Sequence, residues 1–213
     1  MTTRTTLSTE PPTEGSEQGP AVPRRPGEST AVLPAATLTP AAAGEWLLDA
    51  AESTVEFTSA VLGGSMPAHG RFEKLAGRVL VEPDGQVAAK VTVDTTSVAT
   101  RIPTMTMHLR TAGLLAVKRH PSAEFELDDL VVHGSSAEIR GRLTALGVTR
   151  EVALNATGGL DGPELFRLEG EALLHRSEFG LRWNVLKMVP EDVRLDVRLV
   201  FVKAGSDRRT PDA

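Results

Sequence analysis

The residues able to carry chemistry in this 213-residue chain are few, and their spacing matches no catalytic or metal-binding pattern. The five histidines lie far apart, and none has the HxH or HExxH spacing that brings two imidazoles to one metal ion. His108 is the strongest single candidate, although a histidine without a partner at ligand spacing more often caps or solvates the surface. The histidines are His69, His108, His120, His133 and His175. We expect no catalytic residue, no metal site and no cofactor.

Carboxylates and arginines give weaker signals. If Asp128-Asp129 and Glu191-Asp192 each lie on a strand, their side chains point to opposite faces and make poor acid–base pairs. No G-x-S-x-G, P-loop or dinucleotide fingerprint occurs, and the absence of cysteine excludes thiolate chemistry. Three arginines stand next to predicted strand ends, where they are either solvated turn charges or ligands for a lipid phosphate: Arg101, Arg110 and Arg176.

Charge and hydropathy argue against nucleic-acid binding and against a membrane-spanning segment. The net charge is −5 with no basic stripe, which argues against nucleic acid, and no apolar run is long enough to cross a membrane. Arg24-Arg25 precedes an uncharged run ending in small residues, but Pro34 and Pro40 interrupt that run before it forms an apolar signal core. We expect a cytoplasmic protein, with export by a weak twin-arginine-like signal as the alternative.

Composition divides the chain into three parts. Residues 1–44 hold half of the 14 prolines together with many Thr, Glu and Gly, so we expect a disordered tail. We expect residues 205–213 to form a second, short disordered tail. The stretch between them, residues 45–204, leaves about 160 residues for one domain with a sizeable core.

Apolar residues in that domain recur with a period of two. In "SAEIRGRLTA", Ile139 and Leu143 share a face opposite Arg140 and Arg142, and similar alternation recurs in several other segments separated by turn signals. About eight antiparallel strands predict an all-β sandwich or a closed barrel, and the alternation does not distinguish the two. The apolar face mixes small Ala and Gly with Val and Leu, which is compatible with a filled core or with a barrel that keeps space for one ligand.

Residues 103–118 depart from this pattern, because Met105, Leu109 and Ala112 have helical spacing and a basic cluster follows them. The spacing predicts a short helical insertion within the β domain. A second unusual segment, "EFGLRWNVLKMV", contains Phe179 and Trp183 and predicts an apolar loop that lines the rim of a barrel or covers its bottom.

Seven motifs in order resemble the YceI-like family of lipid- and polyisoprenoid-binding domains, from about Trp46 to Ala204. They are "WLLDAAESTVEF", "HGRFEKLAGRV", "VDTTSVAT", "HLRTAGLLAVKRHPSAEFEL", "GRLTALGVTREVAL", "HRSEFGL" and "VPEDVRLDVRLVF". The resemblance implies a lipocalin-like, eight-stranded antiparallel β-barrel with a short helical insertion near residues 103–118. It also implies an apolar interior that holds a long lipid such as an isoprenoid chain.

On this resemblance and the alternation, we expect the ligand to contact inward-facing apolar residues and leucines at the barrel mouth. They are Phe57, Val91, Leu109, Leu114, Leu115, Phe125, Ile139, Leu143, Phe179, Trp183 and Leu199. His108, Arg110 and Arg176 are weaker candidates for a lipid head group. The predicted function is carriage, storage or sensing of an isoprenoid-like or fatty-acyl lipid without catalysis. The alternatives are a small enzyme acting on a hydrophobic metabolite, or a structural, partner-binding domain with a filled core; a homodimer is compatible with each.

Overall fold

The computed structural model describes residues 42–61, 66–111, 113–181 and 191–206. Strands dominate these ranges, with one short α-helix and short 3-10 turns between them. The strands are β1 (Gly44–Leu48), β2 (Thr54–Val61), β3 (Met66–Phe72), β4 (Leu75–Val81), β5 (Val87–Asp94), β6 (Val98–Thr100), β7 (Ser122–His133), β8 (Ser136–Ala145), β9 (Val148–Leu160), β10 (Leu165–His175) and β11 (Asp192–Lys203). The helical elements are η2 (Thr95–Ser97), α1 (Pro103–Leu109) and η3 (Arg176–Phe179).

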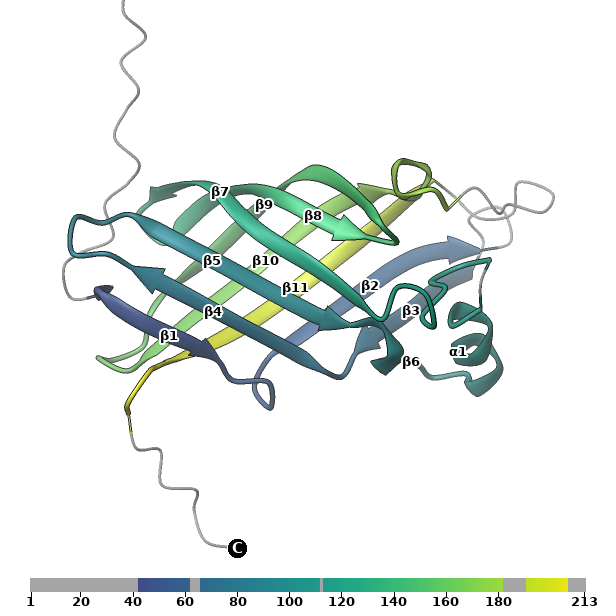
Figure 1. The fold of residues 1–213 in the computed structure, drawn as a ribbon, viewed down its shortest axis with the longest axis horizontal. Coiled ribbons are helices and arrows are strands. Elements are labelled where there is room, and N and C mark those ends of the chain that lie inside the picture. Colours follow the sequence, from purple (N-terminus) through teal and green to yellow (C-terminus); the bar gives the residue numbers. More distant parts are fainter. Residues whose placement is uncertain (1–41, 62–65, 112, 182–190, 207–213) are drawn as a thin grey trace, which may run out of the picture. The chain divides into compact units, whose positions relative to one another are not determined.

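Eight strands close into an antiparallel barrel. Their order is β1-β4-β5-β7-β8-β9-β10-β11, and the pairing of β11 with β1 closes the ring. The remaining strands, β2, β3 and β6, extend the sheet beyond β11 at the end of the barrel that carries α1 (Figure 1). This arrangement confirms the predicted all-β barrel with a short helix, and it decides between the barrel and the sandwich.

Strand β11 pairs with two strands on the same edge. Its last residues, Phe201–Lys203, pair with β1, while Arg194–Arg198 pair with β2. The edge changes partner at Val200, where the backbone N–H donates to the Ser53 hydroxyl at 3.0 Å. Ser53 and Val200 are both buried, so this side chain satisfies a backbone group that the break in the ladder would otherwise leave unpaired.

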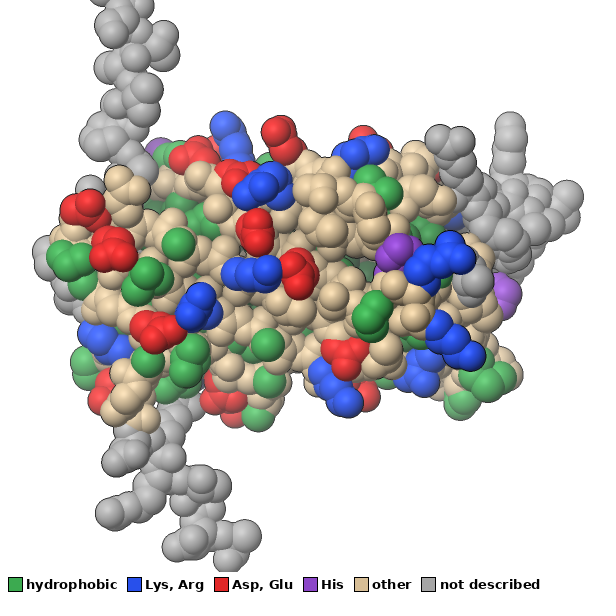
Figure 2. Space-filling model, in the orientation of Figure 1, with side chains coloured by type: hydrophobic (Ala, Val, Ile, Leu, Met, Phe, Trp, Pro, Cys, Tyr) green, Lys and Arg blue, Asp and Glu red, His purple; other side chains and the backbone are tan. Residues whose placement is uncertain are grey.

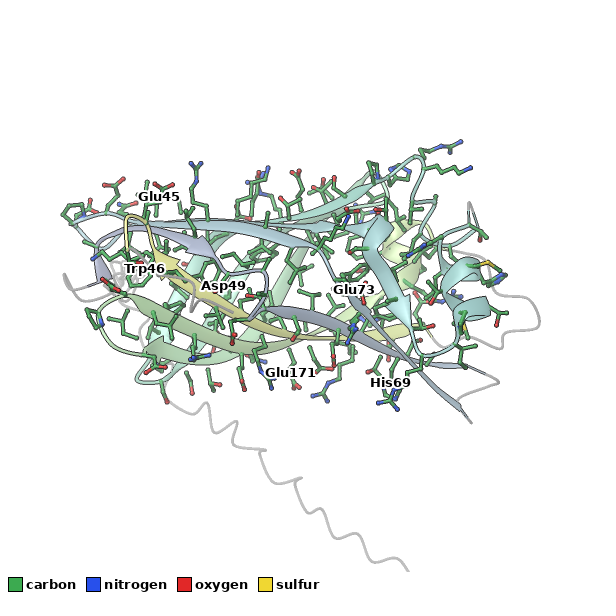
Figure 3. All side chains as sticks on the ribbon, turned by 90° about the horizontal axis from the view of Figure 1, so that it is seen from below. Glu45, Trp46, Asp49, His69, Glu73 and Glu171 are labelled. Atoms are coloured by element: carbon green, nitrogen blue, oxygen red, sulfur yellow. The ribbon has the colours of Figure 1, made fainter. Side chains whose placement is uncertain are left out.

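The two faces of the barrel wall differ sharply in chemistry. Inward residues are apolar, whereas the outer face carries cross-strand ion pairs such as Lys90 with Glu126 (3.3 Å) and Arg142 with Asp128 (3.0 Å). Glu45 and Glu171 lie on this outer face (Figure 3). Because such pairs are exposed, each adds at most about 1 kcal/mol. Burial of the inner face therefore dominates the stability of the barrel.

A β-bulge interrupts the alternation of β7 between Leu127 and Asp129. The extra residue lets Leu127 and Leu130 both face inward and leaves Asp128 and Asp129 both exposed. The sequence-based expectation that these two aspartates point to opposite faces is wrong for this reason.

The helix α1 occupies the first half of the predicted insertion and begins with proline at its first turn, where the missing N–H costs nothing. Thr106 accepts a hydrogen bond from the Thr100 backbone N–H at 2.9 Å, and Arg110 donates to the Val98 carbonyl at 3.0 Å. Both bonds attach the helix to β6. No helix in the described ranges is long and apolar enough to cross a bilayer.

The tail predictions fall mostly outside the described residues. Of the predicted N-terminal tail, only Ala42–Gly44 are described, and Ala42 is buried beneath Trp46, whose indole N–H donates to its carbonyl at 2.8 Å. At the other end, Gly205 and Ser206 are described. Gly44 already belongs to β1. The predicted tails themselves stay predictions.

Asp94 ends β5 and caps η2, and its loss is expected to destabilise the protein. Its Oδ1 accepts hydrogen bonds from the Thr96 N–H (2.8 Å) and hydroxyl (2.5 Å), and the Thr96 hydroxyl lowers the Asp94 pKa below its usual 3.8. We expect Asp94→Ala to reduce the free energy of unfolding by about 1 kcal/mol at neutral pH, measured by denaturant titration. Asp129→Ala, at an exposed carboxylate of β7, is the control and should have little effect.

The pH dependence follows from the lowered pKa. A carboxyl with a depressed folded-state pKa contributes its stabilisation above the unfolded value and loses it as the pH falls through the folded one. The difference between wild type and Asp94→Ala should therefore shrink below about pH 3.8. A difference that stays constant down to acid unfolding would contradict the capping role.

Candidate ligand cavity

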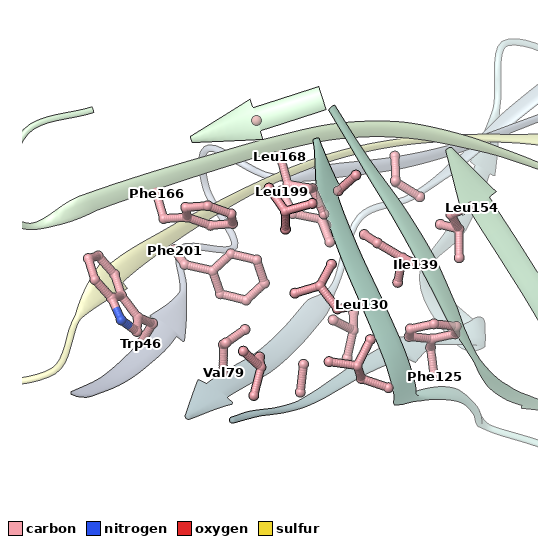
Figure 4. Close-up of a pocket in the computed structure, with 18 of the residues that line it drawn as sticks. Trp46, Val79, Phe125, Leu130, Ile139, Leu154, Phe166, Leu168, Leu199 and Phe201 are labelled. Carbon is pink, nitrogen blue, oxygen red and sulfur yellow. The ribbon is translucent and has the colours of Figure 1, made fainter. Parts of the chain in front are cut away.

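The barrel encloses a cavity of about 410 Å³, within the range of small-molecule sites. Every strand of the closed ring contributes lining residues from its inner face, and β2 contributes Val55. Figure 4 shows side chains from opposite walls, such as Val79, Leu168 and Leu154, projecting into the same space. The barrel interior is therefore not a completely filled core.

None of the described residues that line the cavity carries a charged side chain. Val, Leu, Ala and Phe make up most of the described lining, in which Ser135 and Ser136 carry the hydroxyl groups. The indole N–H of Trp46 is already bonded to Ala42. General acid–base chemistry needs a titratable group within reach of the substrate, and none of the described lining residues supplies one. The lining suits a hydrocarbon, which gains free energy from leaving water without needing hydrogen bonds.

Aromatic side chains form one end of the cavity. Trp46 is almost fully buried, and the rings of Phe166 and Phe201 lie 6.3 Å apart in a tilted arrangement (Figure 4). The Lys203 ammonium lies 5.6 Å from the Trp46 ring, so its stem covers the indole from outside. These three aromatics were absent from the predicted site.

The exposed lining residues all belong to one end of the barrel. They lie in the β7–β8 turn and at the end of β9, and they are Gly134, Ser135, Ser136, Gly159 and Leu160. Strand β7 starts beside η2, near α1, and runs away from it, so these turns and α1 lie at opposite ends (Figure 1). Among the described residues, the exposed part of the cavity lining therefore lies at the end away from α1.

A second hollow, of about 520 Å³, lies where β9 and β10 separate. Their ladder runs from Leu160 to Asn155, after which the two strands diverge. Val152 and Ala172 line both this hollow and the main cavity, so only one layer of side chains separates them. Phe179, carried by η3, is buried in the gap and completes the wall there.

The structure brings some of the predicted ligand-contact residues together. Val91, Phe125, Ile139, Leu143 and Leu199 all line the cavity, although the predicted contact of each with a ligand stays a prediction. Phe57 packs elsewhere, with its ring over Gly70 and 5.6 Å from the ring of Phe72.

The other predicted residues lie outside the cavity lining. The leucines of the α1 segment are half-buried, and Phe179 faces the second hollow. Trp183 lies outside the described residues. Of the head-group candidates, Arg110 is bonded to β6 and Arg176 is buried with its Nε 4.0 Å from Glu191. The predicted ligand contacts of Leu109, Leu114, Leu115, Phe179 and Trp183 stay predictions. The same holds for the predicted head-group contacts of His108, Arg110 and Arg176.

Glycine at position 141 allows Phe125 to lie flat against the neighbouring strand. A Cβ at Gly141 would approach the Phe125 ring to 2.4 Å and the Glu126 carbonyl to 2.3 Å, distances that no real Cβ tolerates. We expect Gly141→Ala to lower the free energy of unfolding by about 1–3 kcal/mol and to displace Phe125. Gly159→Ala is the matched control, because a Cβ there meets nothing within 4 Å. Equal effects of the two substitutions in denaturant unfolding would contradict this packing.

Comparison with known proteins agrees with the fold. The family model of the YceI-like domain matches residues 46–201. The chain belongs to the YceI-like family. A UPF0312 protein of Pseudomonas aeruginosa is 34% identical over 138 residues, covering 62% of this chain and 72% of that protein.

Two solved structures share the YceI-like fold. BcnA of Burkholderia cenocepacia superposes with a TM-score of 0.65 at 23% identity, covering 72% of this chain and 98% of BcnA. A polyisoprenoid-binding domain from Saccharophagus degradans, implicated in plant cell wall breakdown, gives 0.63 at 17% identity, covering 74% and 98%. At these identities the likeness establishes the barrel and leaves the ligand of this chain to be argued from its own cavity.

Proposed function

We propose that this protein binds one long apolar lipid, isoprenoid-like or fatty-acyl, inside the barrel, and that it carries, stores or senses the lipid without chemical conversion. The observation that carries the proposal is the cavity of about 410 Å³, whose described lining residues carry no charge and are exposed at the end away from α1. The polyisoprenoid-binding domain among the similar structures supports the same ligand class.

The energetics favour a chain over a compact metabolite. Each buried methylene contributes roughly 0.8 kcal/mol, so a five-carbon isoprene unit contributes about 3–4 kcal/mol before costs. Association costs about 4–15 kcal/mol, which two to five such units offset. Affinity should therefore rise with chain length until the cavity is filled, because the lining offers no other strong contact.

The polar end of the lipid should lie at the exposed end of the cavity. Ser135 and Ser136 are the hydroxyl-bearing lining residues, and both are exposed in the β7–β8 turn. Hydroxyls and solvent can hydrogen-bond an alcohol or a carbonyl there. A phosphate or carboxylate drawn deeper would lose its hydration without meeting a cation, which is strongly unfavourable. An uncharged head group, or a charged one held wholly in solvent, fits this site.

Ala89 offers a direct way to reduce the cavity. It lines the cavity from β5, whereas its neighbour Ala88 is exposed on the outer face. We expect Ala89→Phe to displace about one isoprene unit and to weaken binding of a long polyprenol at least tenfold, measured by displacement of a fluorescent fatty-acyl probe. Ala88→Phe adds the same side chain outside and should bind like wild type. Equal affinity of both variants and wild type would show that the ligand does not occupy the barrel.

A further inference from the structure

The end of the barrel that carries α1 has an unusual charge balance. Residues 95–123 contain no Asp or Glu, although the whole chain has a net charge of −5. The same stretch contains four cations, Arg101, Arg110, Lys118 and Arg119. We call the exposed part of residues 101–119 the α1 surface. Lys and Arg side chains gather over this end in Figure 2.

Ion pairing distinguishes these cations from those on the barrel wall. Wall arginines meet carboxylates across or along strands, as Arg78 meets Glu45 and Arg167 meets Asp161. Among the described residues, no ion pair includes any of the four cations of the α1 surface. Arg110 donates to the Val98 carbonyl, which is a neutral acceptor. The α1 surface is therefore a concentrated positive region on an acidic protein.

The same stretch of sequence also contains two large, exposed apolar side chains. Met107 on α1 is 67% exposed, and Ile102 at the start of the helix is 54% exposed. Exposed apolar side chains flanked by Lys and Arg are typical of segments that lie in the interface of a membrane. A nucleic acid would match the charge but would leave both apolar side chains in water.

We propose that the α1 surface docks the barrel onto an anionic lipid surface. Ile102 and Met107 enter the boundary between head groups and acyl chains, while Arg101, Lys118 and Arg119 contact lipid phosphates. Each basic residue near an anionic membrane contributes an attraction that salt screens. This inference does not depend on what the cavity binds.

The test is co-sedimentation of the full 213-residue protein with vesicles. We expect binding to mixed phosphatidylcholine–phosphatidylglycerol vesicles at low salt, and little binding to pure phosphatidylcholine. Lys118→Gln/Arg119→Gln should lower the partition coefficient about 30-fold, because two basic residues are lost. Arg78→Gln/Arg167→Gln removes the same charge from the opposite end and should bind like wild type.

The apolar contribution has its own pair of variants. Met107→Ser should weaken vesicle binding several-fold, whereas Leu173→Ser, which removes a 58% exposed leucine from β10, should not. Absence of binding to the mixed vesicles would overturn the proposal. Equal losses of binding in Lys118→Gln/Arg119→Gln and in Arg78→Gln/Arg167→Gln would overturn it as well. Binding to a DNA duplex in place of vesicles would also overturn it.

Discussion

The structure depends on the closure of the sheet between β1 and β11. A sheet closed on itself has no free edge along the paired strands, and it holds its inner side chains at a fixed distance from those of the opposite wall. Strand β11 makes this closure while also pairing with β2, and Ser53 satisfies the backbone at Val200 where the partners change. The extension β2-β3-β6 therefore grows from the barrel wall without opening it along β1.

Closure of the barrel does not by itself leave a cavity inside. The cavity depends on which side chains line the interior. Alanines such as Ala89, Ala123 and Ala137 share the lining with valines and leucines, so the side chains of facing walls do not meet everywhere. Phe125 consumes little of the interior because its ring lies over Gly141. The same device places Phe57 over Gly70 in the extension. Small residues thus act twice, by leaving space in the cavity and by letting large rings lie flat against the wall.

Alternation in the sequence predicted which strand residues face the interior. Period two identified the inward positions of Val91, Ile139 and Leu199, because burial of one face leaves a direct mark on residue types. Alternation says nothing about which strands are neighbours, so the ring closure was predicted only through the resemblance to the YceI-like family. The double pairing of β11 was not predicted at all. The bulge after Leu127 was also hidden, because one inserted residue resembles ordinary variation.

The site itself was harder to predict than the wall. Helical spacing marked the α1 segment correctly, and the family resemblance suggested that its leucines line the mouth. That role stays a prediction, and the exposed residues among the described cavity lining lie at the other end. Sequence spacing reports local structure and contains no information about which end of a barrel is open. The importance of Gly134, Ser135 and Ser136 follows only from the strand direction of β7, which the register fixes. A turn motif read alone predicts a turn and no ligand.

The most direct test of this account is native mass spectrometry of the protein purified without detergent, followed by the same measurement after denaturation. The account predicts one additional mass per chain, lost on denaturation and matching a lipid with a long apolar chain. A barrel of unchanged mass, even after incubation with polyprenols and fatty-acyl lipids, would contradict the claim that the cavity is a lipid site.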